Sequence, residues 1–361
     1  MQERSSNFNK GNGMSATIYD VAAKAGVSFQ LASAVLGNKK YARASEATRK
    51  RIREAARALD YRSSMAATVL AGGSSKIIGV IIDSRAPESM FRILAEIEQT
   101  ADRLGYRILT AQAHDNPEKL LDSYYSLKQN GVDGIISFAH DYSPLNCHLD
   151  EVLKDDPKIV FVLEAPECPC SSVDVDTAGA MQSAVAHLRE QGYRKIALML
   201  NKTDKTAPLA RTGEQRIEGF AKACPEGRIL YISAHPANFS SLPQDIVGIK
   251  SACRKLIGDV LIPQKFDAVI AQNDIFAAAL MGQLLAEGIR IPRDFGIIGW
   301  DNLLYDELFP VPLTSVASDC NGIVESVMKI LIDKINGDPE PVRIKFPLKL
   351  MIRESSMKNQ I

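Results

Sequence analysis

Several features that define common protein classes are missing from this sequence. No stretch approaches the roughly 18 consecutive apolar residues that a transmembrane helix needs. The opening residues, MQERSSNFNKGNGMS, contain no apolar core of a secretory signal. We therefore expect a cytoplasmic protein with no membrane partner, and either Met1 or Met14 is a candidate start.

Signals of metal binding and of catalysis are also missing. The six cysteines form no C-x-x-C pair, so the sequence predicts reduced thiols and no metal site. There is no G-x-S-x-G, no Walker loop and no nucleotide-type G-x-G-x-x-G. We therefore expect neither a cofactor nor an enzymatic activity.

The net charge of zero conceals an uneven distribution of charge along the chain. Residues 1–76 hold 13 basic and 5 acidic residues, whereas the remainder holds 30 basic and 38 acidic ones. A small basic unit attached to an acidic body is typical of a protein whose head binds a polyanion such as nucleic acid.

Residues 17–37, TIYDVAAKAGVSFQLASAVLG, carry the strongest pattern in the chain. Thr17 followed by Asp20 is typical of a capped helix start, and Gly26 is expected in a turn with positive φ. The second helix, capped by Ser28, buries its apolar positions and leaves an outer face made of Phe29, Gln30, Ser33 and Ala34. This pattern indicates a helix-turn-helix that sets its second helix in the major groove of double-stranded DNA. The alternative is an ordinary helical hairpin.

A third helix and a short connecting segment follow the helix pair. The helix is predicted from Ser45 to about Leu59, with an outer face of Arg and Lys that can meet phosphate. Tyr61 closes this head. Residues 64–71 have the length of one or two helical turns, which is too short for a stable helix alone in water. We expect them to form a hinge helix only against DNA or against a second copy of the same segment.

Strand and helix patterns alternate from Ile77 onward. Strands are predicted at 77–83, 106–112, 133–139, 158–164, 195–200, 228–234, 268–272 and 295–300, and helices at 90–105, 119–129, 177–192, 213–223, 245–257 and 274–287. Repeated βαβ units imply parallel sheets with helices on both faces, here in two halves with a cleft between them. The expected fold class is α/β: a small all-α helix-turn-helix head, a hinge helix and two doubly wound parallel-sheet subdomains.

Short motifs stand in a characteristic order along nearly the whole chain. They are Ile18-x-Asp20-Val21-Ala22, Ala25-Gly26-Val27-Ser28, Ala67-x-x-Leu70-Ala71-Gly72, Val132-Asp133-Gly134, Arg216-x-x-Gly219-Phe220, Asn273-Asp274-x-x-Ala277, Gly299-Trp300-Asp301 and Arg353-Glu354-Ser355-Ser356. With these motifs the chain resembles transcriptional regulators of the LacI/GalR family. The resemblance implies a homodimer that binds a palindromic operator, and a core similar to type I periplasmic sugar-binding proteins. It also implies that a small effector, a sugar or nucleoside-like metabolite, controls DNA affinity.

The resemblance implies DNA contacts in the head and the hinge. Phe29 and Gln30 match base-reading positions, where Phe can pack on a thymine methyl group and Gln can bond adenine. Leu70 matches a leucine that wedges into the minor groove, with dimer packing as the alternative. The remaining candidates are Thr17, Ser28, Ser33, Ala34, Tyr61 and Ala67. Ala34 stands where the family often has Arg, which is the strongest reader of guanine, so the usual half-site sequence is in doubt.

The resemblance also implies an effector site in the cleft. Arg216, Asn273 and Asp301 match effector contacts, and their donors and acceptors suit sugar hydroxyls. Trp300, the only tryptophan, can stack on a sugar ring or belong to the core. Two other residues of the core have structural interpretations: Asp176 is expected to cap a helix and His187 to lie on an apolar helix face.

Asp83 and Arg85 follow the first strand of the core, at the edge where doubly wound folds bind ligands. They are candidate effector contacts, with solvated loop residues as the alternative.

The expected organisation has four parts. They are a tail at 1–16, the head at 17–61, the hinge helix and linker at 62–76, and the core at 77–361, in which 77–174 and 304–331 form one subdomain and 175–303 and 332–361 the other. Two other functions stay open: a soluble sugar-binding protein, and a sugar-modifying enzyme fused to a DNA-binding head.

Overall fold

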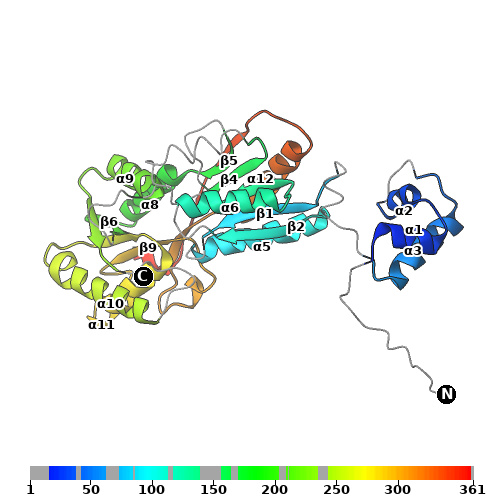
Figure 1. Cartoon of the computed structure of the whole chain (residues 1–361). Helices are drawn as coiled ribbons and strands as arrows, with labels where there is room; N and C mark the ends of the chain where they lie inside the picture. The colour runs from blue at the N-terminus through cyan, green and yellow to red at the C-terminus, as the bar shows by residue number, and fades with distance from the viewer. Residues whose placement is uncertain are drawn as a thin grey trace, which may run out of the picture. The chain divides into compact units, whose positions relative to one another are not determined.

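The computed structural model describes residues 16–37, 42–61, 73–83, 86–112, 117–138, 156–163, 170–202, 209, 211–234 and 243–358. The chain divides into two compact units, Met1–Ser75 and Lys76–Ile361, drawn in Figure 1. In the part of the chain that the structure describes, no helix is long and apolar enough to cross a membrane.

Within residues 16–37 and 42–61, the first unit contains three helices: α1 (Ile18–Ala25), α2 (Phe29–Leu36) and α3 (Glu46–Ala58). Thr17 and Asp20 form a reciprocal capping box at the start of α1. Gly26 ends that helix at φ 62°, which confirms the predicted left-handed turn. Ser28 then caps α2 by accepting the amide of Leu31 at 3.3 Å.

All three helices contribute to one small apolar core, centred on Val21, Val35 and Ile52, each fully buried. The prediction that Ala34 lies on the outer face of α2 was wrong, because this residue is only 8% exposed. Ala34 lies three positions after Leu31 and therefore on the same side of the helix, where one methyl group is easily covered.

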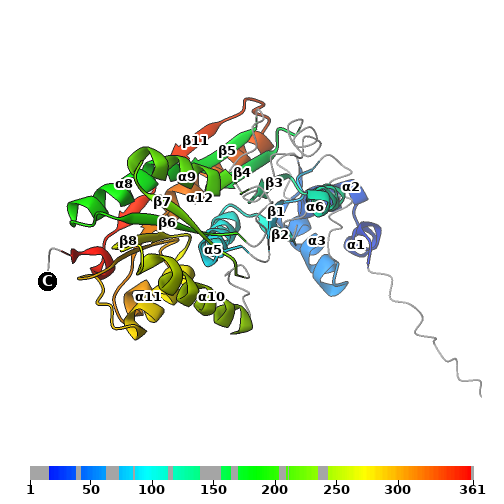
Figure 2. The same ribbon diagram turned by 90° about the vertical axis from the view of Figure 1, so that its left-hand side faces the viewer.

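The second unit contains two six-stranded sheets. The first is parallel throughout, in the order β11-β5-β4-β3-β1-β2. Its strands are β1 (Ile77–Ile82), β2 (Arg107–Gln112), β3 (Gly134–Ser137), β4 (Ile159–Leu163), β5 (Ser171–Val175) and β11 (Arg343–Phe346). Helices α5 (Glu88–Arg103) and α12 (Cys320–Ile335) pack on one face, and α6 (Pro117–Gln129) packs on the other. Figure 2 shows β11 beside β5, although they lie far apart in the sequence.

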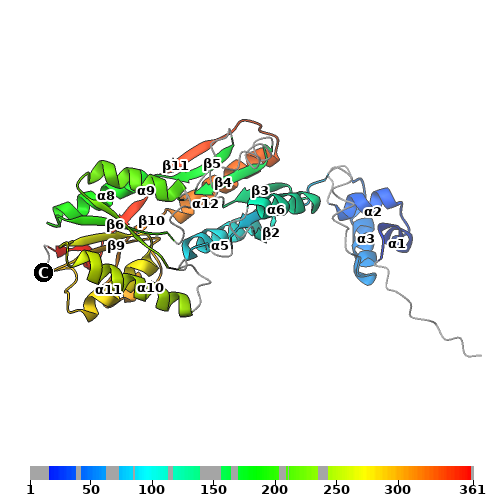
Figure 3. The ribbon, with the colours of Figure 1, turned by 60° about the vertical axis from the view of Figure 1, so that its left-hand side comes forward.

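The second sheet has the order β12-β10-β9-β8-β6-β7, in which only β12 is antiparallel to its neighbour. Its strands are β6 (Ile196–Asn201), β7 (Arg228–Ile232), β8 (Ala268–Ala271), β9 (Gly296–Trp300), β10 (Thr314–Ala317) and β12 (Lys349–Met351). Helices α8 (Thr177–Glu190) and α9 (Arg211–Ala223) cover one face, and α10 (Pro243–Leu256) and α11 (Asp274–Ala286) the other (Figure 3). The described part of this unit also contains three short helical turns: η1 (Ile257–Leu261), η2 (Asp306–Leu308) and η3 (Glu354–Ser356).

The chain passes between the two sheets at three places: after β5, after β10 and after β11. The expected subdomain boundaries near 303 and 331 were therefore wrong. Residues 314–317 pair with β9 in the second sheet, and residues 343–346 pair with β5 in the first. The buried side chains of Leu313 and Val316 explain why the boundary near 303 was wrong, because they extend the core of the second sheet.

Helices α8 and α9 approach each other closely at one glycine. A Cβ atom built on Gly219 of α9 would lie 2.7 Å from the carbonyl oxygen of Ala178 and 3.0 Å from the Cβ of Met181. Only glycine therefore fits here, and the close packing fixes the position of α9.

Candidate functional site

The first two helices of the head together present an exposed aromatic pair, Tyr19 of α1 and Phe29 of α2. Phe29, its first residue, is 42% exposed, and its ring centroid lies 5.1 Å from that of Tyr19, which is 63% exposed. Gln30 and Ser33 are exposed on the same helix. Two large aromatic rings held together at a helix N-terminus form a rigid apolar surface beside amide and hydroxyl groups, which suits contact with base edges.

The other predicted DNA contacts of the head have structural roles as well. The side chains of Thr17 and Ser28 cap α1 and α2. Tyr61 packs half-buried against the head core, and burial raises the pKa of its hydroxyl. Ala67 and Leu70 of the predicted hinge lie outside the described residues.

A cavity of about 580 Å³ lies in the second unit, with walls from both sheets and from the first turns of several helices. Four predicted effector residues line it: Arg216, Asn273, Trp300 and Asp301. Asp83 is buried at the end of β1 and is not part of the lining, and Arg85 lies outside the described residues.

Arg216 is held in place from two sides. Its guanidinium carbon lies 4.1 Å from the centroid of the Trp300 ring, and its Nη1 donates to the carbonyl oxygen of Gln272 at 2.5 Å. Trp300 is 6% exposed and belongs to the core beneath the cavity. Because Arg216 covers one face of the indole, Trp300 orients the guanidinium through a cation–π contact.

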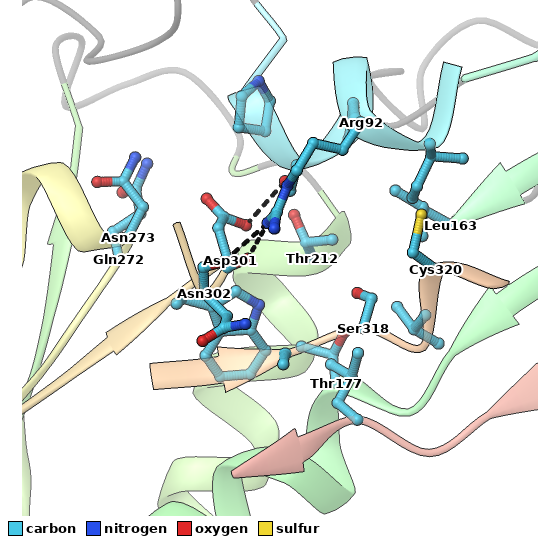
Figure 4. Close-up of a pocket in the computed structure, with 18 of the residues that line it drawn as sticks. Arg92, Leu163, Thr177, Thr212, Gln272, Asn273, Asp301, Asn302, Ser318 and Cys320 are labelled. Atoms are coloured by element: carbon cyan, nitrogen blue, oxygen red, sulfur yellow. Dashed lines mark hydrogen bonds between the residues drawn. The ribbon is translucent and has the colours of Figure 1, made fainter. Parts of the chain in front are cut away.

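Asp301 lies on a turn with an unusual backbone. Its φ is 108° and that of Asn302 is 51°, both in the region that disfavours side chains. Helix α5 of the other sheet holds this turn: Arg92 Nη2 donates to the carbonyl oxygens of Asp301 at 2.8 Å and of Asn302 at 2.9 Å. Ser89 Oγ donates to Asp301 Oδ1 at 3.2 Å. Figure 4 shows Arg92 over Asp301 with these bonds dashed.

Burial raises the pKa of Asp301 to about 6, against the opposing effects of Arg216, Ser89 and Arg92. The carboxyl group is therefore mostly ionised at neutral pH. The charges of two guanidinium groups from different helices, Arg216 and Arg92, act on it. This arrangement offers an acceptor and several donors to a ligand with many hydroxyl groups.

Asn273 has a second role as the N-cap of α11, where its Oδ1 accepts the amide of Phe276 at 3.0 Å. Sequence reasoning missed several polar residues of the lining, which are Ser89, Arg92, Thr177, Thr212, Gln272, Asn302 and Ser318. Their positions carried a signal, because in a doubly wound fold the first turns of helices and the ends of strands meet at the ligand cleft.

Two structural interpretations of polar residues in the core are confirmed. The side chain of Asp176 caps α8 by accepting the amide of Gly179 at 3.3 Å. His187 is buried, and its Nε2 lies 2.7 Å from Ser356 Oγ. Among the described residues, no group of three His, Cys, Asp or Glu side chains is arranged to hold a metal ion.

Comparison with known proteins assigns both units of the chain. A family model described as "Bacterial regulatory proteins, lacI family" matches residues 17–64, and one described as "Periplasmic binding protein-like domain" matches residues 185–356. The transcriptional regulator DegA of Bacillus subtilis is 30% identical over 311 residues, which cover 84% of this chain and 87% of that protein. The chain belongs to the LacI family of bacterial regulatory proteins.

Other proteins match over nearly the full length of the chain. The transcriptional repressor PurR of Mannheimia succiniciproducens is 27% identical over 345 residues, covering 95% of this chain and 99% of that protein. The structure of the Lac repressor dimer bound to operator and an anti-inducer superposes with a TM-score of 0.79 at 22% identity. That superposition covers 95% of this chain and 100% of that one. A complex of the regulator CelR with cellobiose gives a TM-score of 0.63 at 25% identity, covering 94% of this chain and 99% of that one. This LacI-family chain is a transcription regulator and not an enzyme.

Proposed function

We propose that this regulator binds a palindromic operator as a homodimer, and that a small polyhydroxylated metabolite, a sugar, sets its affinity for DNA. The observation that carries the proposal is the cavity in which Arg216, Asn273 and Asp301, from three separate segments, surround one space. A ligand there contacts elements of both sheets and so favours one arrangement of the core.

The DNA-binding part of the proposal rests on the head. Phe29 and Gln30 are exposed at the start of α2, and the outer face of α3 carries the exposed cations Lys50, Arg51 and Arg53. The helix gives base contacts and the cations give phosphate contacts. The proposal also retains Ala67 and Leu70 as minor-groove contacts.

The sugar part of the proposal rests on the chemistry of the lining. Hydroxyls, amides, two guanidinium groups and Asp301 give both donors and acceptors around the cavity. The complex of the transcriptional regulator CelR with cellobiose shows a regulator of similar fold that holds a sugar. A nucleoside is the second candidate, and the screen described below separates the two.

DNA selection from random oligonucleotides, followed by titration of the full chain, tests the head. We expect one enriched palindrome and an affinity that falls steeply with salt, because phosphate contacts release counterions. Gln30→Ala should cost about 1–3 kcal/mol of discrimination at one base pair. Gln99→Ala, the same change on the exposed face of α5, should cost nothing. Equal binding of the enriched and random DNA would contradict the proposal.

Intrinsic fluorescence tests the cavity, because Trp300 is the only tryptophan and lies in its wall. The full chain is titrated with sugars, sugar alcohols and nucleosides. For a compound that binds, Asp301→Ala should weaken affinity by about 1–3 kcal/mol, or roughly 5- to 150-fold, while operator binding without ligand is kept. Asp102→Ala, an exposed aspartate on α5, is the matched control. An unchanged ligand affinity in Asp301→Ala would remove Asp301 from the site.

A further inference from the structure

A pair of buried carboxyl groups lies behind the turn that carries Asp301. Asp274, the first residue of α11, and Asp306, in η2, are both 0% exposed. Neither lines the cavity. They lie close enough for the ionisation of one to affect the other.

Asp274 holds the backbone of the turn from behind. Its Oδ2 accepts the amide of Leu303 at 3.0 Å, and its Oδ1 accepts the hydroxyl of Ser315 at 2.6 Å. That hydroxyl in turn accepts the amide of Asn302 at 3.0 Å. The two residues that follow Asp301 are therefore fixed through one carboxylate. A turn with positive φ at Asp301 and Asn302 persists only where its surroundings hold it in this way.

Asp306 lacks such partners in the described part of the chain. Neither of its carboxyl oxygens accepts a hydrogen bond of normal geometry there, although Asp274 and the Leu303 amide are near enough to lower its pKa. Arg353 Nη1 lies 4.0 Å from Oδ2, but it donates to the carbonyl oxygen of Leu313 at 2.8 Å. A buried carboxylate without a donor is strongly unfavourable, whereas a carboxylic acid brings its own O–H donor.

The charged and titratable groups that face the pair come from four segments. They are Asp301 after β9, Arg92 on α5, Tyr305 before η2 and Arg353 near the end of the chain. Burial, with the charges of Asp306 and Asp301, raises the pKa of Asp274 well above its usual value. Burial raises the pKa of Asp306 to about 6, against the opposing effects of Asp274, Arg353, the Leu303 amide and Arg92. Two carboxyl groups in this position do not readily ionise together.

We infer that Asp274 and Asp306 share one proton, and that Asp274 is a positioning residue which, in this singly charged pair, holds Asp301 toward the cavity. Loss of the proton leaves two buried negative charges behind the turn. Because the raised pKa values belong to the folded state, the pair stabilises the core at low pH, and this contribution is lost as pH rises. The consequence for the effector rests on the proposed role of Asp301, whereas the shared proton does not.

The test uses the full chain without ligand. The melting temperature and the Trp300 emission are followed from about pH 5.5 to about pH 9 for the wild type, Asp306→Asn and the exposed control Asp102→Asn. The amide of asparagine donates permanently, as the protonated acid does. We expect the wild type and the control to lose several degrees as pH rises, with a parallel change in emission. Asp306→Asn should show a flatter profile and exceed the wild type at high pH. Equal slopes in all three proteins would overturn the inference.

A second measurement needs no variant. Infrared difference spectra of wild-type protein with ¹³C-labelled aspartate should show a protonated carboxyl group that persists near neutral pH and titrates with the melting temperature. Absence of this band would overturn the inference even if Asp306→Asn does not fold. A screen in which no metabolite binds would refute the proposed effector and leave both of these results unchanged.

Discussion

Replacing Gly219 by alanine tests how closely α8 and α9 must pack to place Arg216 in the cavity. The added Cβ would lie 2.7 Å from the carbonyl oxygen of Ala178 and 2.9 Å from its Cα. Both are backbone atoms, so no side-chain rotation can relieve the clash. Arg216 lies three residues earlier on α9, and a displaced helix moves its guanidinium away from Trp300.

Two opposing effects set the change in folding stability that Gly219→Ala causes. Overpacking costs about 1–3 kcal/mol, and alanine in place of glycine within a helix gains about 1 kcal/mol. Because the obstruction is backbone, the upper part of the overpacking range applies, and we expect a net loss of about 2 kcal/mol. For a core of this size that lowers the melting temperature by roughly 4–8 °C.

Gly282→Ala is the matched control, since Gly282 lies within α11, is exposed, and a Cβ there meets nothing within 4 Å. It should stabilise the core by about 0.5–1 kcal/mol. Both variants are compared by thermal unfolding of the full chain. If Gly219→Ala were as stable as this control, the close helix contact would not have the energetic weight assigned to it.

Three further predictions concern other parts of the chain. Burial lowers the pKa of His187. The stability that neutral His187 contributes to the folded core is therefore present above about pH 6.5 and is lost as pH falls. His187→Gln should flatten the acid side of the melting-temperature profile. Thr17→Ala removes the cap of α1 and should cost the head about 1 kcal/mol in denaturant unfolding followed by circular dichroism. Arg92→Ala should speed amide hydrogen exchange in residues 301–305, whereas Arg103→Ala, an α5 side chain that donates to Thr100 of the same helix, should not. Equal exchange in both variants would show that α5 does not hold the turn.

The sequence predicted the head and most of the core because their patterns are local. Capping residues, Gly26 and the apolar spacing defined α1 to α3, and buried apolar runs defined strands such as β1 and β9. Elements late in the chain, such as β11, were missed because they depend on distant partners rather than on a local pattern. β11, RIKF, alternates charged and apolar residues and is stable only as the edge partner of β5. Nothing local in the sequence reveals that pairing.

The candidate cavity was only partly predictable from the sequence. Arg216, Asn273 and Asp301 were found through short motifs, and these residues do line one space. Ser89 and Arg92 were missed, because their contact with Asp301 joins residues more than 200 positions apart. The burial of Asp306 was equally hidden, since an aspartate is mostly found exposed to solvent.

The three crossings between the sheets have a consequence for synthesis on the ribosome. β5 is made long before its edge partner β11, and α12, which covers one face of the first sheet, also follows every strand of the second sheet but β12. While the second half is being translated, the first sheet therefore has an unpaired edge, and the face that it shares with α5 is only partly covered, so both are prone to wrong association. The native pairing of this edge and the full covering of this face become available only near the end of translation, once α12 and β11 have been made.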